Sequence, residues 1–447
     1  ENKLREGWPS QMASAGRREP IRYSSFFHDE SSSSNACTID LNNEVQKKPL
    51  RAQLDAIRDM CIAAGLLPKN YMRESPRQAF SHLAMMIKRR PQWDKHKSTS
   101  SNFATKARKE RETGAFEEAA ESFSIAIRTA PSADEAQKLQ SERQDLLTHR
   151  QTKFLKETLD TFRCKSESQS KFPLRIEEAK KSCGEEGRTM RVTTKIKAGQ
   201  TVLRESPFSM AIAPSQIHDR CHYCLQTLRV PLPTPKSYGE KRRIRNFNIW
   251  IPCKSCAYAV YCSFECRDKA WSDWHAIECG HPIFTAVPKE TVLAVRTMIR
   301  TFLCDELRGE DGDQSRSKAE RVSSLVSHLD KLSRQEFKDL GFQAVMMEWY
   351  FKKMLERRTV PRERMLLQRM DAYSILEYLA KIKFNAMAVS GQSLQEIQNE
   401  HAVNNVLSEK YGLGLFAFAS MMNHSCIPNS QLRFTAGPTL RVLATEE

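Results

Sequence analysis

The chain has 447 residues and a mass of 51.4 kDa, which corresponds to about three domains of about 150 residues each. Its 70 Lys and Arg residues outnumber its 54 Asp and Glu residues, and the net charge of +16 permits acidic partners but carries no information about the fold. Only 16 residues are Gly and no apolar run reaches about 18 residues, so collagen-like and membrane-spanning chains are excluded.

The first 22 residues are rich in charge and lack the apolar centre of a secretory signal peptide. We therefore expect the chain in a reducing compartment, the nucleus and/or the cytoplasm, where its 13 cysteines need a role other than disulfide formation. Residues 1–49 are predicted to be mostly disordered, most clearly at the serine-rich stretch 31–36.

Residues 50–170 are predicted to form a helical, tetratricopeptide-like region. Positions at the offsets of one tetratricopeptide repeat are Gly114, Phe116, Ala119, Phe123, Ala126 and Pro131. Because one repeat cannot bury its own face, we expect the helical patterns at 50–67 and 134–162 to pack against it. A simple helical hairpin is the alternative interpretation.

Residues 180–215 contain a segment with the alternation of a β-hairpin. The predicted strands are 190–196 and 201–205, and the predicted turn is 197–200. By itself this pattern is generic.

Seven of the 13 cysteines crowd into residues 221–279, in pairs with ligand spacing. Including one histidine, the pairs are Cys221 and Cys224, Cys253 and Cys256, Cys262 and Cys266, and His275 and Cys279. Eight such ligands predict two tetrahedral zinc ions. The alternative, a set of buried cysteines without metal, does not explain a repeated spacing. His222 and His281 lie outside the pairs and are interpreted as surface histidines.

Residues 285–400 are predicted to be a helical segment. Apolar residues recur at helical spacing in 290–307, 318–332, 343–357 and 362–383, and the polar stretch 308–317 is interpreted as a linker.

Residues 405–447 begin with an apolar run at 413–422 that must be buried. Asn423, His424, Ser425 and Cys426 follow it, and two strands are predicted at 430–434 and 439–445. Buried polar groups need partners, so this sequence is either a site or a satisfied turn that caps a strand.

The cysteine pattern, with Tyr261 before Cys262 and Trp274 before His275, resembles a MYND zinc finger. The resemblance implies interleaved ligands: the first and third pairs bind one zinc ion, and the second and fourth pairs bind the other. The 28 residues between Cys224 and Cys253 exceed the usual gap of that family, and we interpret this insertion as an exposed loop.

The sequence Asn-His-Ser-Cys-x2-Pro-Asn from Asn423, together with Gly-Arg at 187–188 before the predicted hairpin, resembles SET-domain lysine methyltransferases. A SET domain split by a MYND finger is the hallmark of the SET and MYND domain-containing (SMYD-type) family, here over about residues 184–447. The resemblance implies an α+β fold. A β-rich SET core would be split by the finger and a helical insert, and an α-helical repeat-like region would precede it.

The resemblance also implies that S-adenosylmethionine is bound by Gly187, Arg188, Asn385, Asn423 and His424. Phe416 and Phe418 follow the same pattern and could line a pocket, although plain core packing is favoured for Phe418.

Two features depart from the family pattern. Thr189 stands where a second glycine is usual, and a Cβ there crowds backbone that must approach a ligand. The catalytic tyrosine is expected beyond Glu447, together with a cysteine-rich tail that would join Cys426 at a third zinc ion, so we interpret the chain as a fragment.

The leading functional hypothesis is an S-adenosylmethionine-dependent lysine N-methyltransferase acting on histone or non-histone proteins. The alternative is a non-catalytic adaptor, in which the MYND finger and the helical repeats bind partner proteins and a degenerate SET domain is a scaffold. Nucleic-acid binding is a third option, permitted by the net charge and the basic run 241–245, but charge runs are usually solvated and no aromatic residues interleave with this one.

Overall fold

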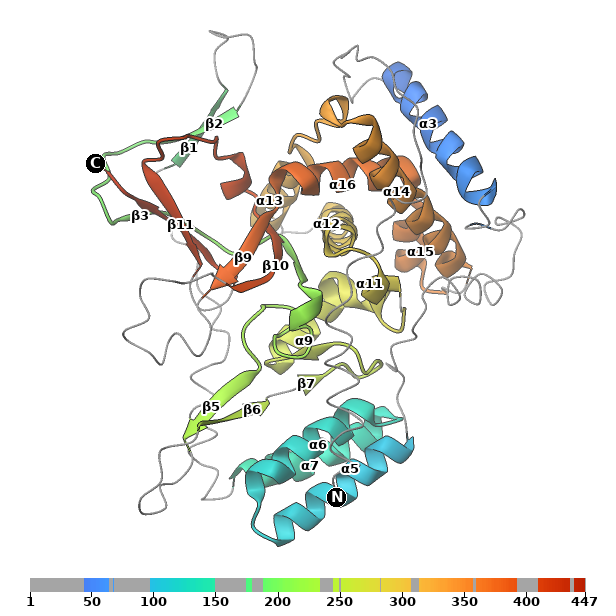
Figure 1. Ribbon diagram of the computed structural model, residues 1–447, viewed down its shortest axis with the longest axis vertical. Helices are drawn as coiled ribbons and strands as arrows, with labels where there is room; N and C mark the ends of the chain where they lie inside the picture. Colours follow the sequence, from blue (N-terminus) through green and yellow to red (C-terminus); the bar gives the residue numbers. More distant parts are fainter. Residues whose placement is uncertain are drawn as a thin grey trace. The chain divides into compact units, whose positions relative to one another are not determined.

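The computed structural model describes residues 44–63, 67, 97–148, 174–178, 188–233, 244–248, 251–281, 283–306, 313–356, 359–391, 409–434 and 438–446. The chain divides into two compact units. The first unit comprises residues 1–90 and 282–386, and the second comprises residues 91–281 and 387–447. Every described strand lies in the second unit, and the fold is α+β (Figure 1). Within the described ranges, no helix is both long and apolar enough to cross a membrane.

The described elements of the first unit are helical. They are α3 (Glu44–Ala63), α11 (Ile283–Ala286), α12 (Lys289–Glu306), α13 (Asp313–Ser323), the short turn η6 (Leu329–Lys331), α14 (Arg334–Leu355), α15 (Pro361–Gln368) and α16 (Ala372–Asn385). Helix α14 packs against α3, α15 and α16, while α12 packs against α13 and α16. The centre of α14 buries three aromatic side chains, Trp349, Tyr350 and Phe351, each at most 1% exposed.

Two helix boundaries in this unit differ from the prediction because capping residues set them. The helix expected at 362–383 is two helices, since the Asp371 carboxylate accepts hydrogen bonds from the Tyr373 and Ser374 backbone N–H groups and begins α16. The helix expected at 343–357 begins nine residues earlier, at the capping box of Ser333 and Glu336. The polar linker 308–317 is also partly wrong, because α13 begins at Asp313.

Helix α3, which contains most of the pattern expected at 50–67, packs on α14 of its own unit. Gly341 of α14 leaves room for it: a Cβ at this position would lie 2.6 Å from Cδ1 of Ile57. Arg58 of α3 donates to the buried Glu348 carboxylate at 2.8 Å. The helix also begins at Glu44, inside the segment expected to be mostly disordered, of which residues 1–43 lie outside the described ranges.

The second unit begins with α5 (Lys97–Glu112), α6 (Phe116–Thr129) and α7 (Ala133–Thr148). The turn between α5 and α6 contains Gly114 with φ of +79°, a conformation that glycine adopts without strain. Ala107, Ala119, Phe123 and Leu139 form part of a shared core, so α7 covers the pair as expected. Assignment of these helices to the tetratricopeptide class stays a prediction, and residues 149–162 of the expected pattern are not described.

Two three-stranded antiparallel sheets follow. One has the order β11 (Ser430–Phe434), β12 (Leu440–Ala444), β3 (Thr201–Glu205), and the other the order β4 (Ser209–Ile212), β10 (Glu409–Leu415), β9 (Met387–Gly391). Each sheet therefore joins strands from before the cysteine-rich region to strands from the end of the chain. The pairing of 430–434 with the following strand agrees with the prediction.

The predicted hairpin of 190–196 with 201–205 is wrong. β2 (Arg188–Val192) pairs with β1 (Leu174–Glu178), and β3 pairs with β12. The turn itself is present, but its Gly199 N–H donates to the Ala444 carbonyl and the Ala444 N–H donates to Gln200. The Gln200 carbonyl, which a local hairpin would use, is thus bonded to a strand more than 200 residues away in sequence.

Candidate metal centre and cofactor segment

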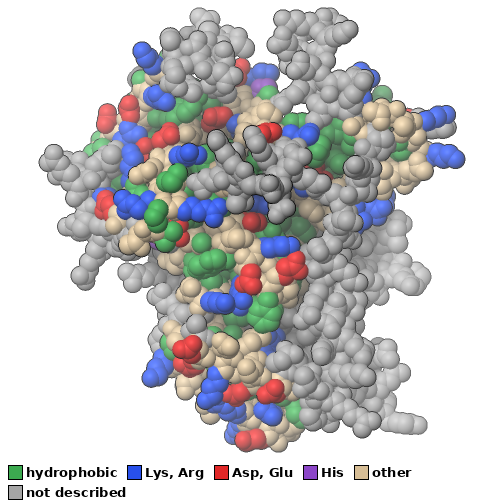
Figure 2. Space-filling view, turned by 180° about the vertical axis from the view of Figure 1, so that it is seen from behind, with side chains coloured by type: hydrophobic (Ala, Val, Ile, Leu, Met, Phe, Trp, Pro, Cys, Tyr) green, Lys and Arg blue, Asp and Glu red, His purple; other side chains and the backbone are tan. Residues whose placement is uncertain are grey.

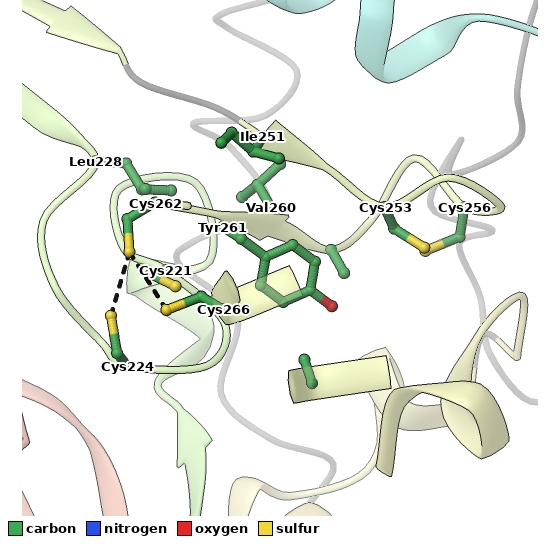
Figure 3. Close-up of a cluster of buried hydrophobic side chains, with 12 residues drawn as sticks. Cys221, Cys224, Leu228, Ile251, Cys253, Cys256, Val260, Tyr261, Cys262 and Cys266 are labelled. Carbon is green, nitrogen blue, oxygen red and sulfur yellow. Dashed lines mark hydrogen bonds between the residues drawn. The ribbon is translucent and has the colours of Figure 1, made fainter. Parts of the chain in front are cut away.

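Two groups of four ligand atoms lie within residues 221–279. The first group is Cys221, Cys224, Cys262 and Cys266, and the second is Cys253, Cys256, His275 and Cys279. In each group the ligand atoms all lie within 4.8 Å of one another, and seven of the eight residues are buried. Figure 3 shows the first group gathered on one side of the Tyr261 ring, with Cys253 and Cys256 on the other side. The two groups combine the ligand pairs as the family resemblance implied.

The distances within each group fit zinc. Ligands at 2.3 Å from a tetrahedral ion are separated by about 3.8 Å, and a sulfur and a nitrogen ligand by about 3.5 Å. The Sγ atoms of Cys224 and Cys262 are 3.4 Å apart, those of Cys262 and Cys266 3.6 Å, and those of Cys253 and Cys279 3.8 Å. His275 Nε2 lies 3.3 Å from Cys253 Sγ and 3.5 Å from Cys256 Sγ. The geometry and the donor set support two structural zinc sites.

Short elements position the second and third ligand pairs. Strand β7 (Ile251–Pro252) pairs with β8 (Val260–Tyr261), and the turn between them carries Cys253 and Cys256. The Cys253 N–H donates to the Ala259 carbonyl at 2.9 Å and closes this turn. Helix α9 (Phe264–Ala270) follows β8, so Cys262 precedes the helix that carries Cys266.

The spacing of four residues predicts that Cys262 and Cys266 share a helix face, and the structure corrects this prediction. Ser263 is the N-cap of α9, and its hydroxyl accepts from the Cys266 N–H at 3.1 Å. The cap turns the chain so that both thiols reach one ion. The other pair is helical as expected, because the Cys279 N–H donates to the His275 carbonyl across the π-helical turn η5 (Trp271–His275) and α10 (Ala276–Glu278).

The first ligand pair is anchored by a strained residue. Leu225 follows Cys224 with φ of +53°, which is unusual for a residue with a Cβ and costs about 1–2 kcal/mol. Its N–H donates to the Cys221 carbonyl, and its side chain is fully buried beside Met210, Ile212 and Val389. Burial of the Leu225 side chain against β4 and β9 offsets the strain and packs this part of the finger against their sheet.

The interpretation of His222 as a surface residue is wrong. Its side chain is 2% exposed, its Nε2 lies 2.8 Å from the Ile217 carbonyl, and its ring meets Tyr258 edge-on at 4.9 Å. His281 is partly exposed, and neither histidine belongs to a ligand group.

The insertion between Cys224 and Cys253 also differs from the prediction. It contains an antiparallel ribbon of β5 (Arg229–Pro233) and β6 (Ile244–Asn248). Val230, Ile244 and Phe247 favour strands, while Pro231 and Pro233 are tolerated because a two-stranded ribbon leaves one side of each strand without a ladder partner. Residues 234–243 and 249–250 lie outside the described ranges.

Helix α6 is hydrogen-bonded to the turn that carries the Cys253 and Cys256 ligands of the second zinc site. Arg128 is 2% exposed and donates from Nε to the Ala257 carbonyl and from Nη2 to the Tyr258 carbonyl, immediately after Cys256. Burial lowers the pKa of Arg128 to about 10, so the guanidinium stays charged at neutral pH. Nothing in the spacing of Arg128 marks it in the sequence, because its partners are carbonyls 129 and 130 residues away.

The ligand side chains perturb one another electrostatically. Burial raises the pKa of the Cys221 thiol well above its ordinary value. Hydrogen bonds from Cys256 and Cys279 lower the pKa of Cys253. Burial opposes a charge on His275, but its contacts with Cys253 and Cys256 outweigh burial and raise its pKa to about 10. Protons and a metal ion therefore compete for these groups.

The structure describes some of the residues predicted to bind S-adenosylmethionine and leaves others outside the described ranges. Gly187 lies outside the described residues, and Arg188 is the first residue of β2, with a side chain that is not described. Asn423 and His424 are exposed in an irregular segment, where His424 Nε2 lies 3.5 Å from Cys426 Sγ. A third zinc ion at Cys426 and a catalytic tyrosine beyond Glu447 stay predictions.

Asn385 ends α16 in the first unit. Its Nδ2 donates to the Lys381 carbonyl at 2.8 Å and to the Val326 carbonyl at 2.9 Å. These bonds connect the end of the helix to a neighbouring segment of the same unit, and a cofactor role for Asn385 stays a prediction.

The apolar run before Asn423 forms a core with one buried charge. Phe416 is fully buried with Leu203, Leu440 and Val442, and Phe418 packs against them, so both aromatics are core residues. Glu205, which the sequence analysis missed, is 2% exposed. Its carboxylate accepts from the Phe418 N–H at 3.0 Å and from the Ala419 N–H at 2.9 Å.

Comparison with known proteins agrees with this geometry. The family model "MYND finger" matches residues 243–279. The match begins after Cys221 and Cys224, and the structure supplies that missing pair by placing it against Cys262 and Cys266.

Similarity to curated proteins extends well beyond the finger. The chain is 22% identical over 310 residues to the protein-lysine N-methyltransferase SMYD4 of Mus musculus, covering 56% of this chain and 38% of that protein. It is 24% identical over 276 residues to the histone-lysine N-methyltransferase SMYD3 of Homo sapiens, covering 62% and 53%. It is 21% identical over 258 residues to the histone-lysine N-methyltransferase ASHR1 of Arabidopsis thaliana, covering 56% and 43%.

The chain thus spans between 38% and 53% of the length of these relatives. More than half of the chain resembles them, whereas the finger itself occupies only residues 221–279. The two interleaved metal groups, set between strands of the same two sheets, and these similarities support an SMYD-type SET and MYND domain-containing protein.

Proposed function

We propose that this protein is a lysine N-methyltransferase that uses S-adenosylmethionine and acts on histone or non-histone proteins. The observation that carries the proposal is the position of β2, which begins with Arg188 and lies beside the turn η7 (Ala419–Met421). Asn423 follows that turn after one residue. Two segments that the family resemblance assigns to the cofactor, far apart in sequence, are therefore neighbours in the second unit.

The side chains in this segment suit such a cofactor. An exposed amide at Asn423 and an exposed imidazole at His424 can bind amino, carboxylate and adenine groups, and the hydrogen-bonded turn before them holds their backbone. The cofactor would supply an electrophilic methyl group. The substrate lysine, with an ordinary pKa of about 10.4, must lose its proton before its nitrogen can attack.

Calorimetric titration of the zinc-loaded chain with S-adenosylhomocysteine tests this proposal. We expect saturable binding that is weakened by Asn423→Ala and by His424→Ala. Asn102→Ala, at an exposed position of α5, is the matched control and should bind like the wild type. Absence of binding by the zinc-loaded wild type would overturn the proposal.

A second candidate function is the non-catalytic adaptor, with partner proteins bound by the finger and the helices. Phe264 and Trp271 favour it, because they lie seven residues apart at the surface of the finger and are 46% and 44% exposed. An adaptor should keep its protein partners after Asn423→Ala and lose them after Phe264→Ala. Affinity purification of the two variants side by side separates adaptor from enzyme.

Nucleic-acid binding is not favoured by the surface. On the face in Figure 2, the Lys and Arg side chains are interspersed with Asp and Glu. Within the basic run 241–245, residues 241–243 lie outside the described ranges and 244–245 belong to β6. For localisation, we propose the nucleus and/or the cytoplasm, which imaging of a fluorescent fusion of the chain tests directly.

A further inference from the structure

The buried carboxylate of Glu205 is the strongest feature that the proposed function does not use. It stands at the end of β3, before the finger, and its partners Phe418 and Ala419 are 213 and 214 residues away in sequence. Glu205 Oε1 lies 3.0 Å from the Phe418 nitrogen, and Oε2 lies 3.3 Å from the same nitrogen and 2.9 Å from that of Ala419. Burying a carboxylate is unfavourable unless such bonds satisfy it, so its position is specific.

The two N–H groups that donate to the Glu205 carboxylate lie at the beginning of the turn η7. Within the turn, the Met421 N–H donates to the Phe418 carbonyl and the Met422 N–H donates to the Ala419 carbonyl. Ser420 adds a hydroxyl that accepts from the Phe416 N–H at 3.3 Å. Glu205 therefore fixes the first residues of a turn whose last bond ends at Met422, directly before Asn423.

The segment after the turn has little support of its own. Asn423, His424 and Cys426 are exposed, and the Ser425 hydroxyl forms hydrogen bonds with the backbone of Ile427 within the segment. The turn held by Glu205 fixes the backbone that leads directly into Asn423 and His424.

We propose that Glu205 is a positioning residue for cofactor binding: it holds the η7 turn so that Asn423 and His424 present their side chains to S-adenosylmethionine. This inference rests on the proposed function, because it assigns the cofactor to the same segment. A glutamine at this position keeps one acceptor oxygen, and an alanine keeps none.

Glu205→Gln and Glu205→Ala test the proposal in the full zinc-loaded chain, with two readouts. The first is the Kd for S-adenosylhomocysteine, which we expect to rise about tenfold in Glu205→Ala and less in Glu205→Gln. The second is hydrogen exchange, which we expect to speed up at the amides of 418–424. Glu348→Gln is the matched control, because Glu348 is a buried carboxylate of the first unit. It should lower Tm without changing either readout.

The two readouts separate this inference from the proposed function. If Glu205→Ala is folded and binds with the wild-type Kd, or if exchange at 418–424 does not change, the positioning role is overturned. If the wild type itself does not bind, the proposed function fails, and the assignment of Glu205 to cofactor binding falls with it. In that case faster exchange in Glu205→Ala would show only that Glu205 holds the turn.

Discussion

The zinc finger and the helices of the first unit are stabilised in different ways. Around its ligand pairs the finger has strands of two residues and a helix of seven, and its small core mixes metal ligands with apolar side chains such as Leu228 and Val260. The first unit has α14, a helix of 22 residues, whose centre buries large side chains such as Trp349 and Phe351. The difference teaches that eight ligand atoms supplement the apolar core where the elements are too short to build a large one. The two regions should respond to different perturbations.

Removal of zinc should produce the largest effect, and only in the second unit. Structural zinc binding contributes about 10–16 kcal/mol in small fingers, so chelation at neutral pH is expected to unfold residues 221–281. Hydrogen exchange should then show loss of protection in 251–266 and retention in α14. Unchanged protection of 251–266 after complete zinc removal would show that the finger has an adequate apolar core of its own.

Truncation of a buried side chain in the first unit should destabilise that unit and leave the zinc finger intact. Trp349→Ala is expected to lower the free energy of unfolding of the first unit by about 3–5 kcal/mol, because a fully buried ring leaves a cavity. The zinc content should remain two ions per chain. Met365→Ala, at a position of α15 that is 49% exposed, is the control and should change stability little. Denaturant unfolding with parallel metal analysis measures both quantities.

Loss of a helix cap should have a smaller effect. Asp371→Ala removes the acceptor of the Tyr373 and Ser374 N–H groups at 2.9 and 3.1 Å and should lower stability by about 1 kcal/mol. Asp371→Asn keeps an acceptor oxygen and should behave nearly like the wild type. Equal losses in both variants would show that the carboxylate charge, not the cap, matters here.

The smallest effect is expected from Glu336, and it should depend on pH. Hydrogen bonds from Lys383 and from Ser333 lower the pKa of Glu336 to about 2. Because this pKa lies below the ordinary value, the stabilisation is complete above about pH 4.3 and is lost as the pH falls towards 2. The difference in Tm between the wild type and Glu336→Gln should therefore shrink between these values. The stabilisation by Glu336 should stay below about 1 kcal/mol and decrease in high salt, since its side chain is 42% exposed.

The metal ligands were predictable from the sequence because their spacing is local. Each pair, such as Cys253 and Cys256, reaches one ion within a single turn, so four residues of sequence are enough to recognise it. The combination of pairs into two sites came from the family resemblance. The helices of the first unit were also predictable from the spacing of apolar residues, although the N-caps Ser333 and Asp371 set boundaries that differ from the prediction.

The features that escaped prediction depend on distant partners. β3 offered the alternation of a hairpin, yet its partner is β12. Glu205 looks like any charged residue at the end of a strand, because burial of a carboxylate leaves no mark in the sequence. Leu225 carries no signal either, since its positive φ is permitted only by packing against β4 and β9.

The pairing of β3 with β12 has a consequence for how fast the protein reaches its native state. Thr201 and Leu443 are register partners although 241 residues lie between them, so this sheet closes a very long loop. Closure entropy grows with loop length, and folding slows as contacts become less local. The zinc finger and the α12–α16 helices are local structures within that loop, so their prior formation shortens the chain that remains to be closed. Zinc uptake should therefore speed the formation of a sheet that contains no zinc ligand.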